Sequence, residues 1–191
     1  AGGSPAYRFT LVAEDDAGIG PRILHGQWSS PSLATGPGGA QVLFSAGDGF
    51  CYAFNPAPAK AEDTAWLKKI WWFDANPPER KLKDGKLRRY PDPEGPSEII
   101  ATPVYRDGRL YVAVGQDPEH GEGVGLLHCY DATKQGDVTA SGRIWSYDKI
   151  QRSISTVSLA GDFLTVADFS GQVHAVDARN GKPHWGHDMK A

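Results

Sequence analysis

Short apolar runs bounded by glycine, proline or polar residues recur along the chain. Three of them lie at residues 42–45, 110–113 and 164–167. Runs of this length between turn residues predict β-strands rather than helices. The 23 Gly and 14 Pro are spread along the chain without a G-X-Y period, which also indicates strands joined by turns.

These runs belong to three units that can be superposed by sequence. Each unit has four β-prone runs, and Gly-containing turns (Gly38-Gly39, Asp107-Gly108 and Gly161-Asp162) separate the first two. The runs are 28–33, 42–45, 49–55 and 69–74 in the first unit, 100–105, 110–113, 125–131 and 143–148 in the second, and 154–159, 164–167, 171–177 and 183–188 in the third. Four antiparallel strands per unit, repeated, predict the blades of a β-propeller.

We therefore expect an all-β chain: a β-propeller of four-stranded antiparallel blades, with about three complete blades and part of another. The predicted parts are a partial blade and entry loop at 6–26, blades at 27–75, 97–150 and 151–191, and an inserted loop at 76–96. The inserted loop is charged and Pro-rich, and its Lys-Asp-Gly-Lys core suits a small hairpin.

Propellers usually close with four to eight blades, so an array of three would leave two blade faces in water. Three explanations stay open. The chain is a fragment of a longer protein, two copies close a six-bladed ring, or another polypeptide covers the ends. The expected partner is therefore a protein or a second copy on the open blade faces.

A tryptophan recurs at one point of the last run, and an aspartate follows it three residues later. The pairs are Trp71 and Asp74, Trp145 and Asp148, and Trp185 and Asp188. A flat indole suits the gap between adjacent sheets, and its N–H needs a partner when it is buried. The aspartates can accept hydrogen bonds near the strand ends. We predict a structural, blade-docking role for all six residues.

The last two runs of the third unit, GQVHAVDARNGKPHWGHD, closely resemble the signature G-x-V-x-A-x-D-x-x-x-G-x-x-x-W of pyrroloquinoline-quinone-type propeller repeats. The second unit keeps the Gly, Asp and Trp anchors around an insertion. In the first unit Asn55 replaces the Asp and the turn is expanded. The segments ILHGQWSSPS, KKIWWFD and ATPVYRDGRLYVAVGQDPEHGEGVG are similar to large repeat proteins of planctomycete-type bacteria, which are often labelled by likeness to the outer-membrane assembly lipoprotein BamB. The resemblance favours a periplasmic or secreted bacterial location.

Charge and hydropathy exclude some partners. The formal net charge is −3, which gives no reason to expect nucleic acid or an anionic membrane. No stretch approaches the ~20 apolar residues of a membrane span. Cys51 and Cys129 belong to different units and align on opposite faces of the repeating strand, so we expect no disulfide between them.

One candidate metal site lies in the insertion between the second and third runs of the second unit. Asp117, Glu119, His120 and Glu122 place three carboxylates and an imidazole within a few residues. Hard cations such as Ca²⁺ favour clustered carboxylates on a Gly-bent loop. The spacing matches no EF-hand, and an ordinary acidic surface loop is the alternative.

Four further residues are candidates for facing the central channel. Ser30, Thr102 and Thr156 occupy similar places in the three first runs, and His25 precedes the first of them. The alternative for His25 is a hydrogen bond that anchors its loop. The small hydroxyl side chains also suit the crowding around a propeller axis. No adjacent His–Asp pair recommends any of these hydroxyls as a nucleophile.

The resemblance raises the question of a quinone cofactor. In quinoprotein dehydrogenases the cofactor lies on the axis between a Trp and a disulfide of adjacent cysteines, with Ca²⁺ beside it. This chain has no adjacent cysteines, so we predict no pyrroloquinoline quinone and no other organic cofactor, with Ca²⁺ on the acidic loop the one candidate ion.

The leading function is a non-catalytic propeller module that serves as a protein-interaction or assembly scaffold. The first alternative is the propeller portion of a quinoprotein oxidoreductase or electron-transfer protein. The second is a glycan- or ligand-binding propeller that uses Trp28, Trp66 and Trp72.

Overall fold

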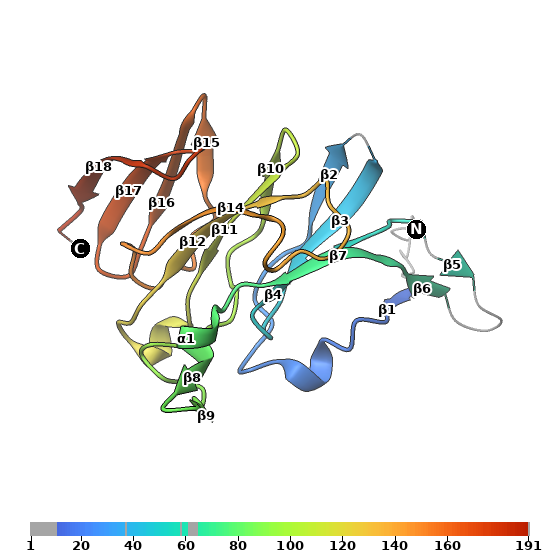
Figure 1. Cartoon of the computed structure of the whole chain (residues 1–191), viewed down its shortest axis with the longest axis horizontal. Helices are drawn as coiled ribbons and strands as arrows, with labels where there is room; N and C mark the ends of the chain where they lie inside the picture. Colours follow the sequence, from blue (N-terminus) through green and yellow to red (C-terminus); the bar gives the residue numbers. More distant parts are fainter. Residues whose placement is uncertain (1–10, 37, 58, 61–64, 191) are drawn as a thin grey trace, which may run out of the picture.

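The computed structural model describes residues 11–36, 38–57, 59–60 and 65–190. In this part of the chain, three antiparallel sheets of the blade type lie side by side, each formed by strands that follow one another in sequence (Figure 1). The predicted fold class, an all-β partial propeller, is confirmed. Residues 6–10 of the predicted partial blade lie outside the described residues.

Each sheet contains an antiparallel meander of four strands. The first contains β2 (Ser32–Gly36), β3 (Gly39–Ser45), β4 (Phe50–Phe54) and β7 (Lys69–Asp74); the second β10 (Val104–Arg106), β11 (Arg109–Val114), β12 (Leu126–Asp131) and β14 (Arg143–Tyr147); the third β15 (Ser158–Ala160), β16 (Phe163–Ala167), β17 (Gln172–Asp177) and β18 (Pro183–Asp188). The short strand β13 (Gly136–Asp137), from the second unit, pairs in parallel with β7 and so ties the second unit to the edge of the first sheet.

The first strand of every sheet begins four residues later than the sequence predicts, at Ser32, Val104 and Ser158. In the first two sheets, the residue just before the strand is a proline, Pro31 or Pro103. Proline has no N–H to donate to a sheet ladder, which explains why the pairing starts after it.

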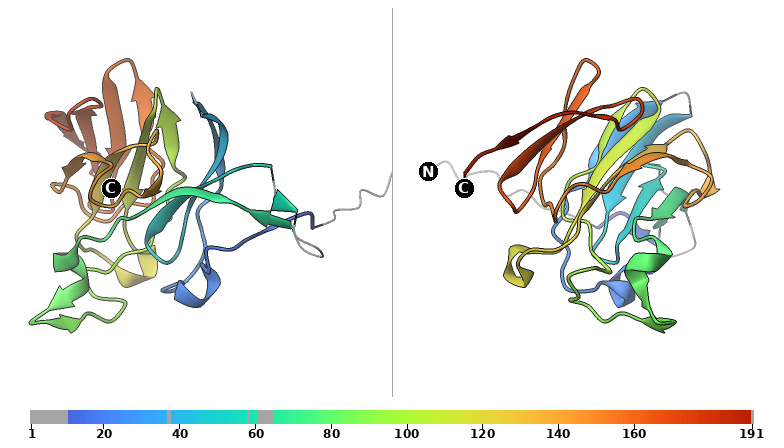
Figure 2. Two further views of the ribbon diagram at one scale, coloured as in Figure 1. Left: turned by 45° about the vertical axis from the view of Figure 1, so that its right-hand side comes forward. Right: turned by 60° about the vertical axis from the view of Figure 1, so that its left-hand side comes forward.

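The inserted segments form small elements at the edges. β1 (Glu14–Asp15) pairs in parallel with β6 (Ala65–Leu67), which also pairs with β5 (Ala59–Lys60). The 76–96 loop contains α1 (Pro78–Lys81) and the hairpin of β8 (Leu82–Lys83) with β9 (Lys86–Leu87), as its Lys-Asp-Gly-Lys core predicts. Two 3₁₀ turns, η1 (Gly20–Arg22) and η2 (Pro118–His120), complete the described elements. Figure 2 shows these small elements projecting from the stacked sheets.

The three repeated tryptophans share one register position. They lie opposite a small residue of the third strand, in the pairs Trp71 with Ala53, Trp145 with Cys129, and Trp185 with Ala175. In each sheet the pairing of the third and fourth strands shifts by one residue next to this pair. A β-bulge therefore lies in the fourth strand immediately before the tryptophan. A bulge increases the local twist and re-aims side chains, and the small opposing residue leaves room for the indole.

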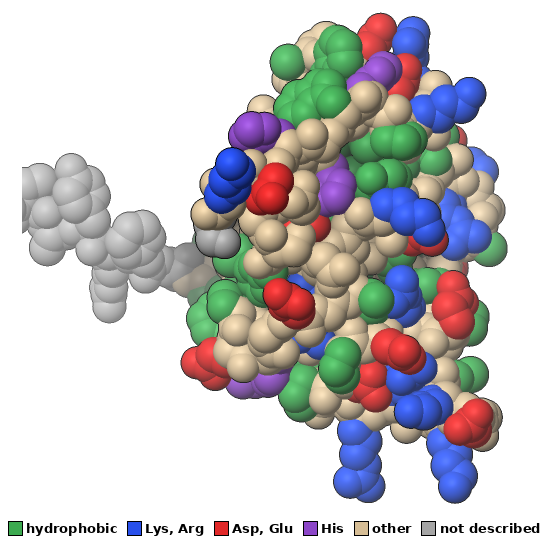
Figure 3. Space-filling model, turned by 90° about the vertical axis from the view of Figure 1, so that its left-hand side faces the viewer, with side chains coloured by type: hydrophobic (Ala, Val, Ile, Leu, Met, Phe, Trp, Pro, Cys, Tyr) green, Lys and Arg blue, Asp and Glu red, His purple; other side chains and the backbone are tan. Residues whose placement is uncertain are grey.

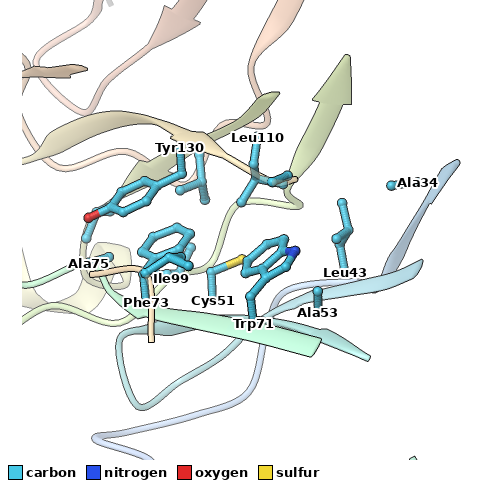
Figure 4. Packing of buried hydrophobic residues seen from close by; sticks show 14 of the residues in the cluster. Ala34, Leu43, Cys51, Ala53, Trp71, Phe73, Ala75, Ile99, Leu110 and Tyr130 are labelled. Atoms are coloured by element: carbon cyan, nitrogen blue, oxygen red, sulfur yellow. The ribbon is translucent and has the colours of Figure 1, made fainter. Parts of the chain in front are cut away.

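Trp71 is wholly buried between the first and second sheets. It packs in one cluster with Leu110 and Tyr130 of the second sheet, and its Nε1 donates to Gln41 Oε1 at 3.1 Å. The ring of Phe73 stacks on that of Tyr130, with centroids 3.7 Å apart and planes 5° from parallel. Figure 4 shows these rings interleaved between the two sheets, with Cys51 beside them.

Trp145 repeats this arrangement between the second and third sheets. It packs in one cluster with Leu164 and Val176, and its Nε1 donates to the Ala178 carbonyl oxygen at 3.1 Å. Gly181, in the turn between β17 and β18, lies directly against the indole. Burial of such large rings is worth several kcal/mol each, so the indoles are a main source of cohesion between sheets.

His128 makes a second kind of link between the first two sheets. Its imidazole is buried, with Nε2 3.0 Å from the Ala75 carbonyl oxygen at the end of β7 and Nδ1 2.7 Å from Ser146 Oγ. Burial lowers the pKa of His128 to about 4, because desolvation of the imidazolium outweighs the hydrogen bond to Ala75.

The contact of Gly181 with Trp145 predicts the effect of adding one methyl group. A Cβ at Gly181 would lie 2.7 Å from Trp145 Cε3, whereas a Cβ at Gly161 would meet nothing within 4 Å, although both glycines have positive φ. We expect Gly161→Ala to cost about 1 kcal/mol of unfolding free energy through its φ alone, and Gly181→Ala about 1–3 kcal/mol more. Urea unfolding measures both, and equal losses would show that the indole is not packed against the turn.

The depressed pKa of His128 predicts a pH dependence of stability. As the pH falls, the histidine is protonated in the unfolded state near pH 6.5 but in the folded state only near pH 4. The stability that the buried neutral imidazole contributes is therefore fully present above pH 6.5 and is lost as the pH falls to about 4. At 1.36 kcal/mol per pH unit the loss is roughly 3 kcal/mol. We expect His128→Gln to lack this component of the pH profile and the exposed control His187→Gln to keep it. Identical profiles for wild type and His128→Gln would contradict the prediction.

Candidate functional site

A polar cluster lies where the segment before β2, the inserted loop and the β11–β12 loop meet. It consists of His25, Tyr90, Glu98, Asp117 and His120. Asp117 and Glu98 are almost wholly buried, at 4% and 0% exposed. The fold brings these residues together because the entry segments of the first two sheets and the β11–β12 loop lie at the same end of the strands.

Asp117 Oδ2 is the centre of the cluster. It lies 2.7 Å from His120 Nδ1, 3.7 Å from His25 Nε2 and 3.1 Å from the Tyr90 hydroxyl, which donates to it. The other oxygen, Oδ1, caps η2 by accepting from Glu119 N at 2.9 Å. Burial raises the pKa of Asp117, but these hydrogen bonds and the nearby imidazoles outweigh it and hold the pKa below its usual value.

Glu98 lies deeper, beneath Tyr90. Its Oε1 is 3.2 Å from the Tyr90 hydroxyl and its Oε2 accepts from Gly26 N at 3.3 Å. Burial, reinforced by the charge of Asp117, raises the pKa of Glu98 above its ordinary value. The two carboxylates therefore have opposite shifts, which is typical of like charges that share one site.

The cluster is open to solvent on the His25 side. Half of the neighbouring indole of Trp28 is exposed (57%), and its ring lies 6.4 Å from that of His25. The His25 ring also lies 6.0 Å from the Tyr90 ring and meets that of His120 edge-on at 5.3 Å. On this side the His25 side chain is 40% exposed to solvent, whereas that of His120 is 18% exposed.

Arg152 holds the loops of the cluster in place. Its buried guanidinium donates to the carbonyl oxygens of His120, Gly121 and Asp92, at 2.7, 3.0 and 3.1 Å. The residue comes from the entry segment of the third sheet. The sequence analysis missed it, because an arginine that binds backbone carbonyls has no acidic partner in the sequence to reveal it.

The structure brings together only part of the predicted metal set. Asp117 and His120 converge with His25, while the side chains of Glu119 and Glu122 are exposed. The grouping with His25 could not be read from spacing, because more than ninety residues separate it from Asp117 in sequence.

The other predicted channel-facing residues lie at the entries to the sheets. Thr156 Oγ1 accepts from Thr102 N at 3.2 Å, which links the second and third entries, and Ser30 is exposed. A neighbouring hydroxyl, Ser29 Oγ, donates to the Ala101 carbonyl oxygen at 3.1 Å and links the first two entries. Their orientation toward a channel stays a prediction.

The three repeated aspartates make local contacts. Asp74 accepts from Asn76 N and pairs with Lys81, Asp188 accepts from Lys190 N, and the exposed Asp148 lies beside Lys149. These contacts close the end of each aspartate's own strand. A contribution of the aspartates to docking between blades stays a prediction.

The outer face of the third sheet is a second candidate site. Trp185 is 50% exposed there, whereas its counterparts Trp71 and Trp145 are 0% and 8% exposed. Every residue of β18 is exposed, as is Phe163, whose ring lies 4.8 Å from that of His184. Figure 3 views the molecule from this side and shows hydrophobic and histidine side chains gathered on it.

The opposite face of the first sheet bears a groove of about 400 Å³ with a mixed lining. Val42, Phe44 and Phe54 line it with Ala13, Ile19 and Leu67, and with the acidic Glu14 and Asp15. Phe54 is only 2% exposed, because it packs in one cluster with Ala17 and Ile19 of the preceding segment. Val42 and Phe54 face each other across the second and third strands of the first sheet. The corresponding pair of the second sheet, Leu110 and Tyr130, covers Trp71. The corresponding pair of the third sheet, Leu164 and Val176, covers Trp145. The groove is thus built like the surfaces that receive an indole elsewhere in the molecule.

Several solved structures share this arrangement of strands. BamB from Moraxella catarrhalis superposes with a TM-score of 0.56 at 18% identity, over 95% of this chain and 41% of BamB. Quinohemoprotein alcohol dehydrogenase from Comamonas testosteroni gives 0.53 at 13% identity, over 78% of this chain and 26% of the enzyme. A europium-containing methanol dehydrogenase gives 0.53 at 13% identity, over 83% and 32%.

The fold is that of a pyrroloquinoline-quinone-type, BamB-like β-propeller. The resemblance seen in the blade signatures is confirmed at the level of the fold, and the chain spans less than half the length of these propellers. No protein-family model and no curated protein sequence matches the chain. Among the described residues, no helix has the length and apolar character needed to cross a bilayer.

The raised pKa of Glu98 predicts that replacing it with the uncharged glutamine destabilises the fold less at pH 7 than at pH 4. A folded-state pKa above the unfolded value means that stability is lost as pH rises from about 4.5 through the folded pKa. We expect the unfolding free energy of Glu98→Gln, relative to wild type, to increase from pH 4 to pH 7 in the presence of a chelator. Glu94→Gln, an exposed residue of the inserted loop, is the control. A difference that stays constant with pH would contradict this environment for Glu98.

Proposed function

We propose that this chain is a non-catalytic propeller module that acts as a protein-interaction or assembly scaffold, and that its open blade faces are the interaction surfaces. The observation that carries the proposal is the half-exposed Trp185. The tryptophans at the corresponding position of the first two sheets, Trp71 and Trp145, are buried because another sheet packs on them. A face of this construction is complementary to another blade.

The covering surface can be specified from the two covered indoles. Each covered indole packs against two apolar side chains of the next sheet, one from its second strand and one from its third strand. The groove lined by Val42, Phe44 and Phe54 carries the corresponding positions of the first sheet. We propose that the outer face of the third sheet in one copy docks here on a second copy, in a head-to-tail contact, and that the segment of Ala17 and Ile19 that covers Phe54 moves aside to admit it.

The location proposed for this module is the bacterial periplasm or the secreted fraction. It is supported by the resemblance of the blade signatures to BamB-labelled repeat proteins and by the fold shared with BamB. Its biological partners are proteins, and the proposal gives no role to nucleic acid.

An oxidoreductase portion is the alternative that the dehydrogenase folds favour. Against it, the chain lacks the adjacent cysteines of the quinone pocket, and both cysteines are buried and unbridged in separate clusters. Titration with pyrroloquinoline quinone and Ca²⁺, followed by a dye-linked alcohol oxidation assay, separates the two. Stoichiometric quinone binding with turnover would replace the scaffold proposal.

A glycan-binding surface has weaker support. Trp28 and Trp66 are exposed, but Trp72 is partly buried under the ammonium group of Lys69, 4.2 Å from its ring centroid. The three indoles come from different segments, and a glycan array would test whether any of them binds sugar.

The open faces predict self-association of the isolated chain. We expect light scattering to give a mass that rises with concentration above that of one chain, because burial of the Trp185 face removes apolar surface from water. Trp185→Asp, and independently Val42→Asp in the groove, should restore the mass of one chain. Trp28→Asp, at an equally exposed indole, is the matched control and should leave association unchanged. A wild-type chain that keeps the mass of one copy at all concentrations, or equal effects of Trp185→Asp and Trp28→Asp, would contradict the proposal.

A further inference from the structure

Three potential metal ligands converge in the polar cluster. One ligand atom each from His25, Asp117 and His120 lies within 4.8 Å of the other two. Two imidazole nitrogens and one carboxylate oxygen form a donor set that divalent transition metals favour. Asp117 is buried and His120 half-buried, so both are held in place, while the exposed His25 lies on the solvent side.

One hydroxyl proton serves two carboxylates in the cluster. The Tyr90 hydroxyl lies 3.1–3.2 Å from Asp117 Oδ2, Glu98 Oε1 and His120 Nδ1, but it has a single proton to donate. Arg152, the buried guanidinium next to the loops, donates instead to backbone carbonyl oxygens. Asp117 Oδ1 and Glu98 Oε2 each accept from a backbone N–H, whereas Asp117 Oδ2 and Glu98 Oε1 compete for the one Tyr90 proton. A cation at Asp117 Oδ2 would therefore offset part of the cost of burying the two carboxylates side by side.

We propose that His25, Asp117 and His120 bind one divalent transition metal ion of the Zn²⁺ class, with the solvent side left for a further ligand. This set replaces the predicted Ca²⁺ site on Asp117, Glu119, His120 and Glu122. Ca²⁺ takes six to eight oxygen ligands, whereas two of the three convergent donors here are nitrogens. Tyr90 and Glu98 are positioning residues, because the Tyr90 hydroxyl connects Glu98 to the ligand Asp117.

The required rearrangement is small. Ligand atoms about 2.1 Å from a tetrahedral metal lie roughly 3.4 Å from one another. Asp117 Oδ2 is 2.7 Å from His120 Nδ1 and 3.7 Å from His25 Nε2, so the largest adjustment is an approach of the His25 ring toward His120. The His25 side chain is 40% exposed, and the backbone on either side of it is held by the hydrogen bonds of Leu24 N and Gly26 N, so the adjustment is a movement of the side chain.

A metal at this place would tie two blades together. His25 belongs to the entry segment of the first sheet, and Asp117 and His120 belong to the β11–β12 loop of the second. Metal binding therefore stabilises the junction between the first and second sheets, in addition to the indole of Trp71. This role is independent of the open faces that carry the proposed function.

The test uses the whole chain, stripped with a chelator and then titrated with ZnCl₂ in a calorimeter and with Co²⁺ in a spectrophotometer. We expect one ion per chain, a visible Co²⁺ absorption band of a nitrogen–oxygen site, and an increase in thermal stability that the chelator reverses. His25→Ala and His120→Ala should each weaken binding on the order of a hundredfold, and Tyr90→Phe about tenfold.

His187→Ala, on the exposed strand β18, is the matched control and should bind as wild type. Circular dichroism and the unfolding midpoint of the metal-free His25→Ala chain show whether it folds, and its exposed position makes it the decisive variant. Absence of stoichiometric Zn²⁺ binding to the wild type, unchanged affinity in a folded His25→Ala, or tighter binding of Ca²⁺ than of Zn²⁺ would each overturn the proposal.

Discussion

Cohesion between the sheets depends on one indole at each junction. A four-stranded sheet has two faces and can bury neither alone, so each must stack on a neighbour. Trp71 and Trp145 fill the gaps between consecutive sheets, and their N–H groups find partners at Gln41 Oε1 and the Ala178 carbonyl oxygen. The β-bulge before each indole, and the small residue opposite it, make the same contact possible at every junction.

The polar cluster is positioned by this stacking. His25 and the Asp117–His120 loop belong to different blades, and they meet because the indole of Trp71 holds the first two sheets face to face. Arg152, from the third blade, then holds this loop through the carbonyl oxygens of His120 and Gly121 and ties it to the inserted loop through that of Asp92. The candidate metal site and the open interaction faces are thus two consequences of one repeated packing contact.

Most of the fold could be predicted from the sequence, because the blade repeat carries its own signals. Glycine turns, short apolar runs and recurring tryptophans predicted the sheets and their order, whereas the register of the third and fourth strands and the bulge before each tryptophan are seen only in the structure. The first strand of each sheet was predicted to start too early, and in the first two sheets the reason is that Pro31 and Pro103 have no N–H to donate to the ladder. The parallel pairing of β13 with β7 and of β1 with β6 arises from insertions that carry no repeat signal. The cluster around Asp117 was found only in part, because it joins residues distant in sequence.

The central claim is that consecutive sheets enclose the repeated indoles, and fluorine NMR of the chain labelled with 5-fluorotryptophan tests it most directly. Single Trp→Phe substitutions assign the resonances, and a soluble paramagnetic agent reports which rings solvent reaches. In dilute solution the resonances of Trp71 and Trp145 should be protected and that of Trp185 strongly broadened. If Trp145 were broadened as much as Trp185, the sheets would not be stacked through their indoles and the account would be wrong.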